Sequence, residues 1–308
     1  MTNTPEFEFI PTKMVEVDHH QDGQRLDNFL MAQYRVLPKG RIYQMIRKGE
    51  VRINGGRAKP ISRLKAGDIV RLPPVKIEKK VEIEIPEKAW KSLQTSIVFE
   101  NNEFLVIDKP SGLAVHAGSE IPYGIIEILK RFGDNDFYEL VQRLDRDTSG
   151  LLLIAKTGKS LRTLQQSDLS RQYALIVEGN WKNHFKEITS IITLPLDTEN
   201  RVNGERHVTV SESGKEAETH FTLINAGKNA SHLQAVLKTG RTHQIRVHSS
   251  ASGFPIVGDA RYNSDSRITG IDRLYLHAER LSFILEDQAY KFESPLPKGF
   301  LSLLNRLN

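Results

Sequence analysis

The positive charge of this chain is concentrated in one short segment, and this asymmetry constrains how the chain can fold. Residues 24–72 contain twelve Lys or Arg residues and three acidic residues, a local charge of +9. The whole chain of 308 residues carries only +5, so the remaining residues sum to −4. The length also exceeds that of a typical single domain. The sequence therefore predicts a small polyanion-binding module attached to a larger, mildly acidic part.

Apolar spacing within the basic segment predicts two short helices followed by two strands. Residues 26–33 have the spacing of an amphipathic helix that ends before Pro38, and residues 42–46 have that of a second one. A strand and a tight turn at Asn54-Gly55-Gly56 follow, and "AGDIVRL" forms a closing strand. The predicted unit is compact, and its basic residues favour contact with phosphates.

The stretches "RLDNFL", "GRIYQMIRKGEVRING" and "LKAGDIVRL" resemble the S4 RNA-binding domain. In that family the second helix and the turn after it lie against RNA. The resemblance therefore implicates Arg41, Lys48 and Arg52 in RNA binding. A module of this kind adds affinity and orientation and reads little sequence.

The rest of the chain has the pattern of an α+β domain. Short β-like runs separated by turns continue from Thr95, with helical stretches such as 124–132 and 160–167 between them. Residues 73–92 open with Pro-Pro and alternate charges, which is typical of a linker. We therefore expect an N-terminal extension over 1–22, an S4-like domain over 23–75, a linker over 76–94 and a catalytic domain over 95–308.

Several function classes are excluded by what the sequence lacks. The chain has no cysteine, which rules out disulfides and cysteine catalysis and favours the cytoplasm. Its apolar runs are too short to cross a membrane, and its first residues do not have the charge of a signal peptide. The segment from Asp145 resembles half of a calcium loop, but Lys156 stands where the loop needs Glu. "TGKS" at 157–160 lacks the leading glycine of a phosphate loop. We expect no metal and no nucleotide cofactor.

Three segments carry the residues suited to catalysis. "VQRLDRDTSGLLLIAKT" at 141–157 sets two acids and two arginines before a buried strand. "RQYALIVEG" places Tyr173 near the start of another strand. "TGRTHQIRVH" at 239–248 is rich in hydrogen-bond donors, and we predict "QIRVH" to be a strand with Arg246 on its polar face. His243 and His248 are interpreted as structural residues rather than metal ligands.

Together these segments resemble the pseudouridine synthases of the large ribosomal subunit. "RLDRDTSG" matches the family's core motif, "IDKPSGLAVHAG" its lysine–proline segment, and "GRTHQIRVH" its late basic segment. The resemblance runs from about Ile97 to the C-terminus. With the S4-like unit it matches the subfamily of synthases C and D, and "LDRDTSG" favours C. It implies a mixed, mainly antiparallel sheet with a central cleft. Gln142 stands where the family has His.

The resemblance also implies roles for individual residues. Asp145 would be the essential carboxylate, Tyr173 the ring stacked on the target base, and Arg246 the partner of Asp145. Arg143 would help displace the base from its stack. The remaining candidates for substrate contact are Lys109, His116, Thr148, Arg241, Thr242 and Gln244. The reaction exchanges no group or electron with a second substrate, so no cofactor is expected.

The expected activity is therefore isomerisation of uridines in 23S ribosomal RNA by a monomer, with no membrane partner. The sequence leaves open whether that RNA is free or part of a large-subunit assembly intermediate. Two alternatives remain open from the sequence. One is a ribosome assembly factor that binds RNA without catalysis, and the other is a synthase that acts on transfer RNA. Retention of the Asp145, Tyr173 and Arg246 set argues against the first alternative.

Overall fold

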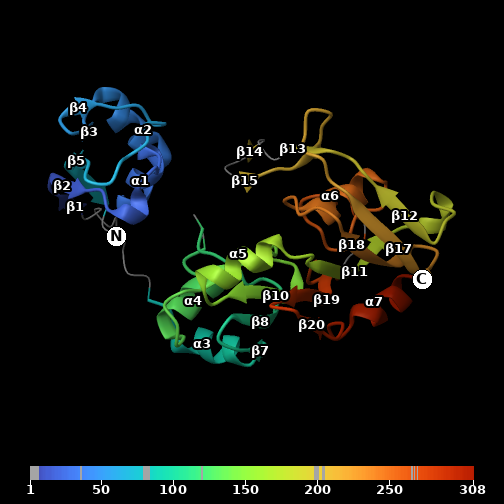
Figure 1. Ribbon diagram of the computed structural model, residues 1–308. Helices are drawn as coiled ribbons and strands as arrows, with labels where there is room; N and C mark the ends of the chain where they lie inside the picture. Colours follow the sequence, from blue (N-terminus) through green and yellow to red (C-terminus); the bar gives the residue numbers. More distant parts are fainter. Residues whose placement is uncertain are drawn as a thin grey trace, which may run out of the picture. The chain divides into compact units, whose positions relative to one another are not determined.

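The computed structural model of this protein describes residues 7–34, 37–78, 84–118, 121–197, 201–202, 205–264, 266, 268 and 270–308. The chain divides into two compact units, Met1–Glu82 and Ile83–Asn308 (Figure 1). We describe each unit by itself. The predicted N-terminal extension contributes strands to the first unit, and the predicted linker contains a strand of the first unit and a helix of the second.

The first unit packs two helices against a small sheet, as an S4-like module requires. Its elements are β1 Phe7–Ile10, β2 Lys13–Glu16, η1 His19–Gln21, α1 Leu26–Gln33, α2 Lys39–Lys48, β3 Arg52–Ile53, β4 Gly56–Arg57, β5 Ile69–Leu72 and β6 Val75–Glu78. Strands β2, β5, β3 and β4 form one sheet in that order, and β1 pairs with β6. Both predicted helices and the turn are confirmed. Gly49, with φ 70°, ends α2, and Asn54 and Gly55 turn the chain at φ 49° and 78°.

The second unit is built on one large mixed sheet. Its helices are α3 Glu87–Gln94, α4 Ile125–Phe132, α5 Gly158–Gln166, η2 Trp181–Asn183, α6 Gln244–Ala251 and α7 Phe300–Leu307. Its strands are β7 Ile97–Glu100, β8 Phe104–Lys109, β9 Glu139–Leu140, β10 Ser149–Ala155, β11 Ser170–Glu178, β12 Thr189–Ile192, β13 Leu196–Asp197, β14 Arg201–Val202, β15 Glu205–Arg206, β16 Thr209–Val210, β17 Thr219–Ala226, β18 Ala230–Leu237, β19 Leu276–Leu285 and β20 Gln288–Glu293.

Strand order places β10 and β19 near the middle of this sheet. The order is β12-β17-β18-β11-β19-β10-β8-β7, with β20 beside β19 (Figure 1). Strand β9 pairs with β10. Strands β10 and β19 run parallel over Ser149 and Gly150, whereas β10 and β8 are antiparallel. The predicted mixed, mainly antiparallel α+β architecture is confirmed.

Strand β10 is buried on both faces, which explains its unbroken apolar sequence. Leu152 and Ile154 belong to the core cluster that also contains the apolar residues of α4. Leu151 and Leu153 belong to the opposite cluster, together with Leu164 of α5. The side chains alternate between the two clusters because the period of a strand is two residues. The segment that precedes β10 therefore begins from a strand held on both sides.

Two sequence predictions were wrong in detail. "QIRVH" is the first part of helix α6, not a strand, and all residues from Gln244 to Ser249 are buried. A helix buried on all sides shows no alternation of exposed and buried residues, so β-branched Ile245 and Val247 favoured the wrong assignment. The end of the predicted linker is helix α3, where Leu93 is buried and Trp90 stacks on Phe132 of α4.

Candidate active site

The loop that carries Asp145 leaves the sheet where β10 and β19 approach most closely. Gly150 has φ 105°, and a Cβ there would lie 2.6 Å from the backbone nitrogen of Ala278 and closer still to its carbonyl oxygen. Only glycine can adopt this backbone so near a neighbouring strand. The close parallel pairing thus fixes the point from which residues 141–148 extend.

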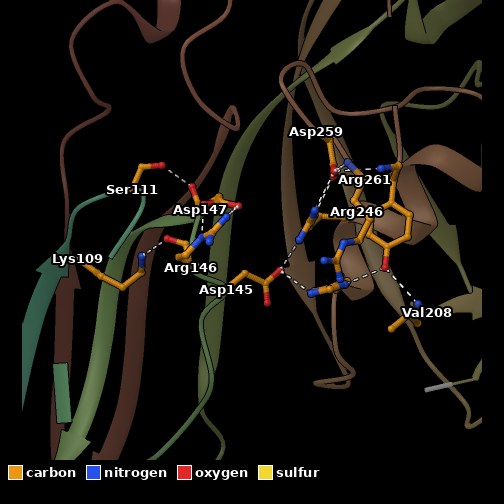
Figure 2. A network of polar contacts seen from close by, with 11 residues as sticks. Lys109, Ser111, Asp145, Arg146, Asp147, Val208, Arg246, Asp259 and Arg261 are labelled. Atoms are coloured by element: carbon orange, nitrogen blue, oxygen red, sulfur yellow. Dashed lines mark hydrogen bonds and ion pairs between the residues drawn. The ribbon is translucent and has the colours of Figure 1, made fainter. Parts of the chain in front are cut away.

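A buried lysine holds the same loop from the other side. Lys109 Nζ donates hydrogen bonds to the carbonyl oxygens of Pro110 at 2.9 Å and Leu113 at 2.9 Å. It also donates to the carbonyl oxygen of Arg146 at 2.7 Å (Figure 2). Ser111 Oγ donates to the Asp147 carbonyl at 2.6 Å. Burial lowers the pKa of Lys109 to about 7. The three carbonyl acceptors within 2.9 Å match the three N–H donors of a charged ammonium group. Lys109 therefore organises backbone and does not line the cavities described below.

Asp145 faces Arg246 across the cleft (Figure 2). Arg246 Nη1 donates to Asp145 Oδ2 at 3.2 Å, and the Asp145 side chain remains 26 % exposed. His243 Nε2 lies 3.8 Å from the same oxygen. The backbone N–H of Thr148 donates to the Asp145 carbonyl at 3.2 Å, which closes the turn. Asp145 is thus held by its backbone while its carboxylate is open to a ligand.

Arg246 is itself fixed by a second carboxylate, that of Asp259. Its Nε and Nη2 each donate to Asp259 at 2.8 Å, and the Asp259 side chain is fully buried. The backbone N–H groups of Arg261 and Tyr262 also donate to Asp259. Burial acts to lower the pKa of Arg246, but the hydrogen bonds and charges of Asp259 and Asp145 outweigh it and leave that pKa raised. Arg246 therefore stays charged beside Asp145.

Sequence reasoning missed two residues of this network, Asp259 and Tyr262, and interpreted a third, His243, only as a structural residue. His243 precedes α6 with φ 53°, and its Nδ1 lies 2.8 Å from the Tyr262 hydroxyl. That hydroxyl also accepts a hydrogen bond from the backbone N–H of Val208 at 3.3 Å. The guanidinium carbon of Arg246 lies over the Tyr262 ring, 5.0 Å from its centre. Burial lowers the pKa of His243, although Asp145 opposes this. Residues three apart lie on the same face of a helix but on opposite faces of a strand. A helix assignment for this segment would therefore have placed His243 beside Arg246, and the strand assignment did not.

Tyr173 is buried in the middle of β11, with only 5 % of its surface exposed. It pairs with Ala235 and Ala278, whose small side chains leave room for its ring, and a bulge precedes it. Burial raises its pKa, Arg171 lowers it and Asp145 raises it further. A small cavity of about 50 Å³ touches Asp145, Tyr173 and Arg246 together, with Arg143, Thr148, Arg241 and Gln244 also in its wall.

A larger cleft of about 1010 Å³ opens beside this cavity. Asp145 and Arg246 line both spaces, so the carboxylate lies where they meet. His116 lines the larger cleft, where its Nδ1 lies 3.7 Å from Glu127. Five arginines contribute to its wall: Arg143, Arg146, Arg246, Arg261 and Arg273. So many guanidinium groups suit a ligand that carries phosphates.

The remaining predicted contacts differ in what they touch. Gln244 accepts from Thr239 and from the Arg241 backbone, and donates to Glu218 and Thr219, so its polar atoms are engaged within the protein. Arg241 Nε donates to the Glu216 carbonyl. Thr242 lies between Arg241 and His243 but does not line either cavity.

In the first unit, arginines line up across three neighbouring strands. Arg52 of β3 is directly opposite Arg57 of β4 on one side and Arg71 of β5 on the other. Like charges directly opposite in a sheet repel each other unless an anion lies between them. Of the predicted contacts, Lys48 is exposed and Arg41 is paired with Glu50 at 3.0 Å. Arg57 was not predicted, because its pairing follows from strand register.

Two kinds of feature are absent from the part of the chain that the structure describes. No group of three or more His, Asp or Glu residues is arranged to hold a metal ion there. None of the helices in that part is both long and apolar enough to span a bilayer.

Comparisons with known proteins agree with this layout. Residues 103–251 match the RNA pseudouridylate synthase family, and residues 24–70 match the S4 domain. The chain is 40% identical to ribosomal large subunit pseudouridine synthase C of Escherichia coli (strain K12), over 96% of each chain. It is 43% identical to the protein of that name from Pasteurella multocida (strain Pm70), over 88% of this chain and 86% of the relative.

Two solved human structures share the fold of the second unit. One, RNA pseudouridylate synthase domain containing 4, has a TM-score of 0.57 and 21% identity over 71% of this chain and 95% of its own. The other, RNA pseudouridylate synthase domain containing 1, has a TM-score of 0.53 and 25% identity over 69% of this chain and 94% of its own.

Proposed function

The chain belongs to the RNA pseudouridylate synthase family, and on this premise we propose that it converts specific uridines of 23S ribosomal RNA to pseudouridine with Asp145 as the reacting carboxylate. The observation that carries the assignment of Asp145 is its ion pair with Arg246, whose geometry Asp259 fixes. The names of the relatives above support the large ribosomal subunit as the source of the substrate, in preference to transfer RNA.

The chemistry explains why these residue types meet. The N1–C1′ bond of uridine breaks, the detached uracil turns, and C5 bonds to C1′; C5 then loses a proton and N1 gains one. Asp145 must be ionised to act as nucleophile or base on the sugar or the ring. Arg246 donates a hydrogen bond to this carboxylate and holds it in place. The balance needs no oxidant or second substrate, so we propose a reaction without metal or cofactor.

The target base must leave its stack to reach Asp145. We assign Tyr173 as the ring against which the flipped base lies, an interaction worth about 1–3 kcal/mol per base. Arg143 is exposed at the mouth of the cavity, where it can take the place of the displaced base. His116, Arg241 and Thr242 are assigned to contact the RNA around the target. Lys109, Thr148 and Gln244 position the loops by the hydrogen bonds described above.

The first unit supplies affinity. We propose that phosphates bind to Arg52 and Arg57, with Lys48 nearby on α2, because an anion relieves the repulsion between the opposed arginines. Arg41 contributes less, because Glu50 partly neutralises it. We further propose that the protein acts as a monomer in the cytoplasm.

Tritium release tests this function directly. Large-subunit ribosomal RNA labelled with [5-³H]uridine, taken from cells that lack the modification, is incubated with the parent protein, Asp145→Asn and the exposed control Asp136→Asn. We expect release by the parent and the control, and none by Asp145→Asn, which still binds the RNA. Binding without release by all three proteins would favour the assembly factor, and release from transfer RNA alone would favour the other alternative.

A further inference from the structure

The small cavity and the larger cleft that meet at Asp145 are together called the catalytic cavity. A second, separate cavity of about 360 Å³ lies next to it. Its wall is made by the first residues of the Asp145 loop, the end of α5, the segment that leads into β11 and the end of β18. Leu237 lines both this cavity and the small cavity at Asp145. Gln142 lines the second cavity, while its neighbour Arg143 lines the catalytic one. Two adjacent residues of the loop thus line different spaces.

Two residues in the wall of this cavity each have a buried polar atom that lacks a hydrogen-bond partner within the described part of the chain. These atoms are Oε1 of Gln142, whose residue is 9 % exposed, and Nε of Arg171. An unsatisfied buried polar atom is unfavourable, and most such atoms in folded proteins have a partner. One atom is an acceptor that needs a donor, and the other is a donor that needs an acceptor.

This pair selects among the parts of an RNA chain. A phosphate could accept from Arg171 but offers no hydrogen to Gln142, and the wall sets the carboxylate of Asp168 beside the cations Arg171 and Lys238. The edge of a nucleobase presents donors and acceptors side by side and matches both atoms. Leu164, Leu169 and Leu237 supply apolar surface for the faces of a base. The volume is also in the range of small-ligand pockets.

We propose that this second cavity binds the base of a nucleotide adjacent to the target uridine, through Gln142 Oε1 and Arg171 Nε. The proposal rests on the function proposed above and adds a determinant of substrate choice to it. While Arg143 faces the catalytic cavity, Gln142 holds the neighbouring base on the other side of the loop. Choice of uridine then depends on whether an adjacent base can also leave the stack and fit.

The test measures whether the cavity and the adjacent base act together. The RNA is an oligoribonucleotide around a uridine that the parent modifies, located by mapping pseudouridine in treated ribosomal RNA. It is made intact, or with an abasic residue at the 5′ or the 3′ neighbour. Single-turnover rates at subsaturating RNA are compared for the parent, Gln142→Leu, Arg171→Lys and the matched control Gln166→Leu, an exposed position on α5 outside the cavity.

We expect removal of one adjacent base to slow the parent and Gln166→Leu about tenfold, as for a lost base-edge contact. Gln142→Leu and Arg171→Lys should have lower single-turnover rates than the parent on intact RNA. Their rates should not fall further on the RNA that lacks that base. Arg171→Lys keeps the charge but not the Nε donor, so it serves if the leucine variant fails to fold.

If a variant acting on the abasic RNA loses rate by the product of the two separate losses, the proposal is overturned. The cavity then holds only water or packs the loop. Coupling of the variants to a methylphosphonate linkage instead of an abasic residue would make the occupant a phosphate, and would also overturn it. Failure of the parent on intact RNA would instead count against the proposed function itself.

Discussion

Asp259 binds Arg246 through two hydrogen bonds of 2.8 Å, and this arrangement leaves Nη1 of Arg246 directed at Asp145. A fully buried carboxylate thus determines the orientation of the group that faces the exposed one. Two carboxylates share a single guanidinium, yet their surroundings differ. Asp259 also accepts from backbone N–H groups, whereas Asp145 keeps part of its surface for a ligand.

Replacement of Asp259 by Asn should slow the reaction with little effect on RNA binding. The amide keeps the shape but loses the charge, so Arg246 is held less firmly beside Asp145. Hydrogen bonds to charged groups contribute about 1.5–3 kcal/mol, so we expect a single-turnover rate about 10- to 100-fold lower. Tritium release at saturating RNA measures this rate, with Asp136→Asn as the control. An unchanged rate would show that Asp145 does not depend on the orientation of Arg246.

Gly150→Ala should destabilise the second unit more than the same change at another left-handed glycine. A Cβ at Gly150 meets the backbone of Ala278, whereas Gly253, with φ 84°, has nothing within 4 Å of that position. Both variants incur backbone strain of about 1 kcal/mol, and Gly150→Ala adds a steric clash with β19. We expect a loss of about 3 kcal/mol or more at Gly150, measured by urea unfolding. Equal losses in the two variants would mean that the strands can separate cheaply.

Lys109→Met should destabilise the protein and abolish activity without removing any group that lines the catalytic cavities. The carbonyls of Pro110 and Leu113 lose their buried donor, whereas that of Arg146 still accepts from the Gly112 N–H. Two unsatisfied acceptors suggest a loss of about 2–4 kcal/mol in the free energy of unfolding. Urea titration and tritium release on the same preparation test this, with exposed Lys130→Met as the control. Full activity in Lys109→Met would contradict the positioning role.

Acidification below pH 6.5 should weaken folding because several histidines are buried. Burial lowers the pKa of His232, His243, His248 and His277 from the usual value of 6.5. Below pH 6.5 the unfolded chain therefore binds protons that the folded chain does not, and stability falls as the pH falls. We expect the urea midpoint to decrease between pH 7 and pH 5, and to decrease less in His232→Gln. A midpoint that is constant over this range would contradict the burial of neutral imidazoles.

Arg57→Gln should weaken RNA binding and reduce its dependence on salt. Each phosphate contact that is lost lowers the slope of log affinity against log salt by about 0.7–0.9. Affinity is measured in proteins that also carry Asp145→Asn, at salt concentrations between about 50 and 200 mM, over which such binding changes steeply. Lys291→Gln, an exposed cation on β20, is the control. Equal slopes for the two variants would remove Arg57 from the RNA contact.

The sequence predicted this architecture well where local patterns decide it. The helices of the first unit follow apolar spacing, and the α+β character of the second follows from short runs between turns. The motif around Asp145 identified the loop. The predicted pairing with Arg246 is present, with Nη1 of Arg246 at 3.2 Å from Oδ2 of Asp145. The catalytic and RNA-binding roles assigned to these residues stay predictions until they are tested.

What the sequence did not predict depends on tertiary contacts. Asp259 and Tyr262 lie outside the motifs used, and only the packing of α6 brings them to Arg246. The strand assigned to "QIRVH" was wrong because a fully buried helix has no polar face to reveal its period. The opposition of Arg52 and Arg57 likewise requires knowledge of strand register.

The pairing of Gly150 with Ala278 also sets the order in which the protein becomes competent during synthesis. Residue 150 reaches its final backbone conformation only against a strand made 128 residues later. Contacts this distant form late, because the intervening chain must first close into a loop. A nascent chain that stops before β19 therefore contains Asp145 but not the strand that fixes the start of β10. Translation itself delays the activity until the chain is nearly finished.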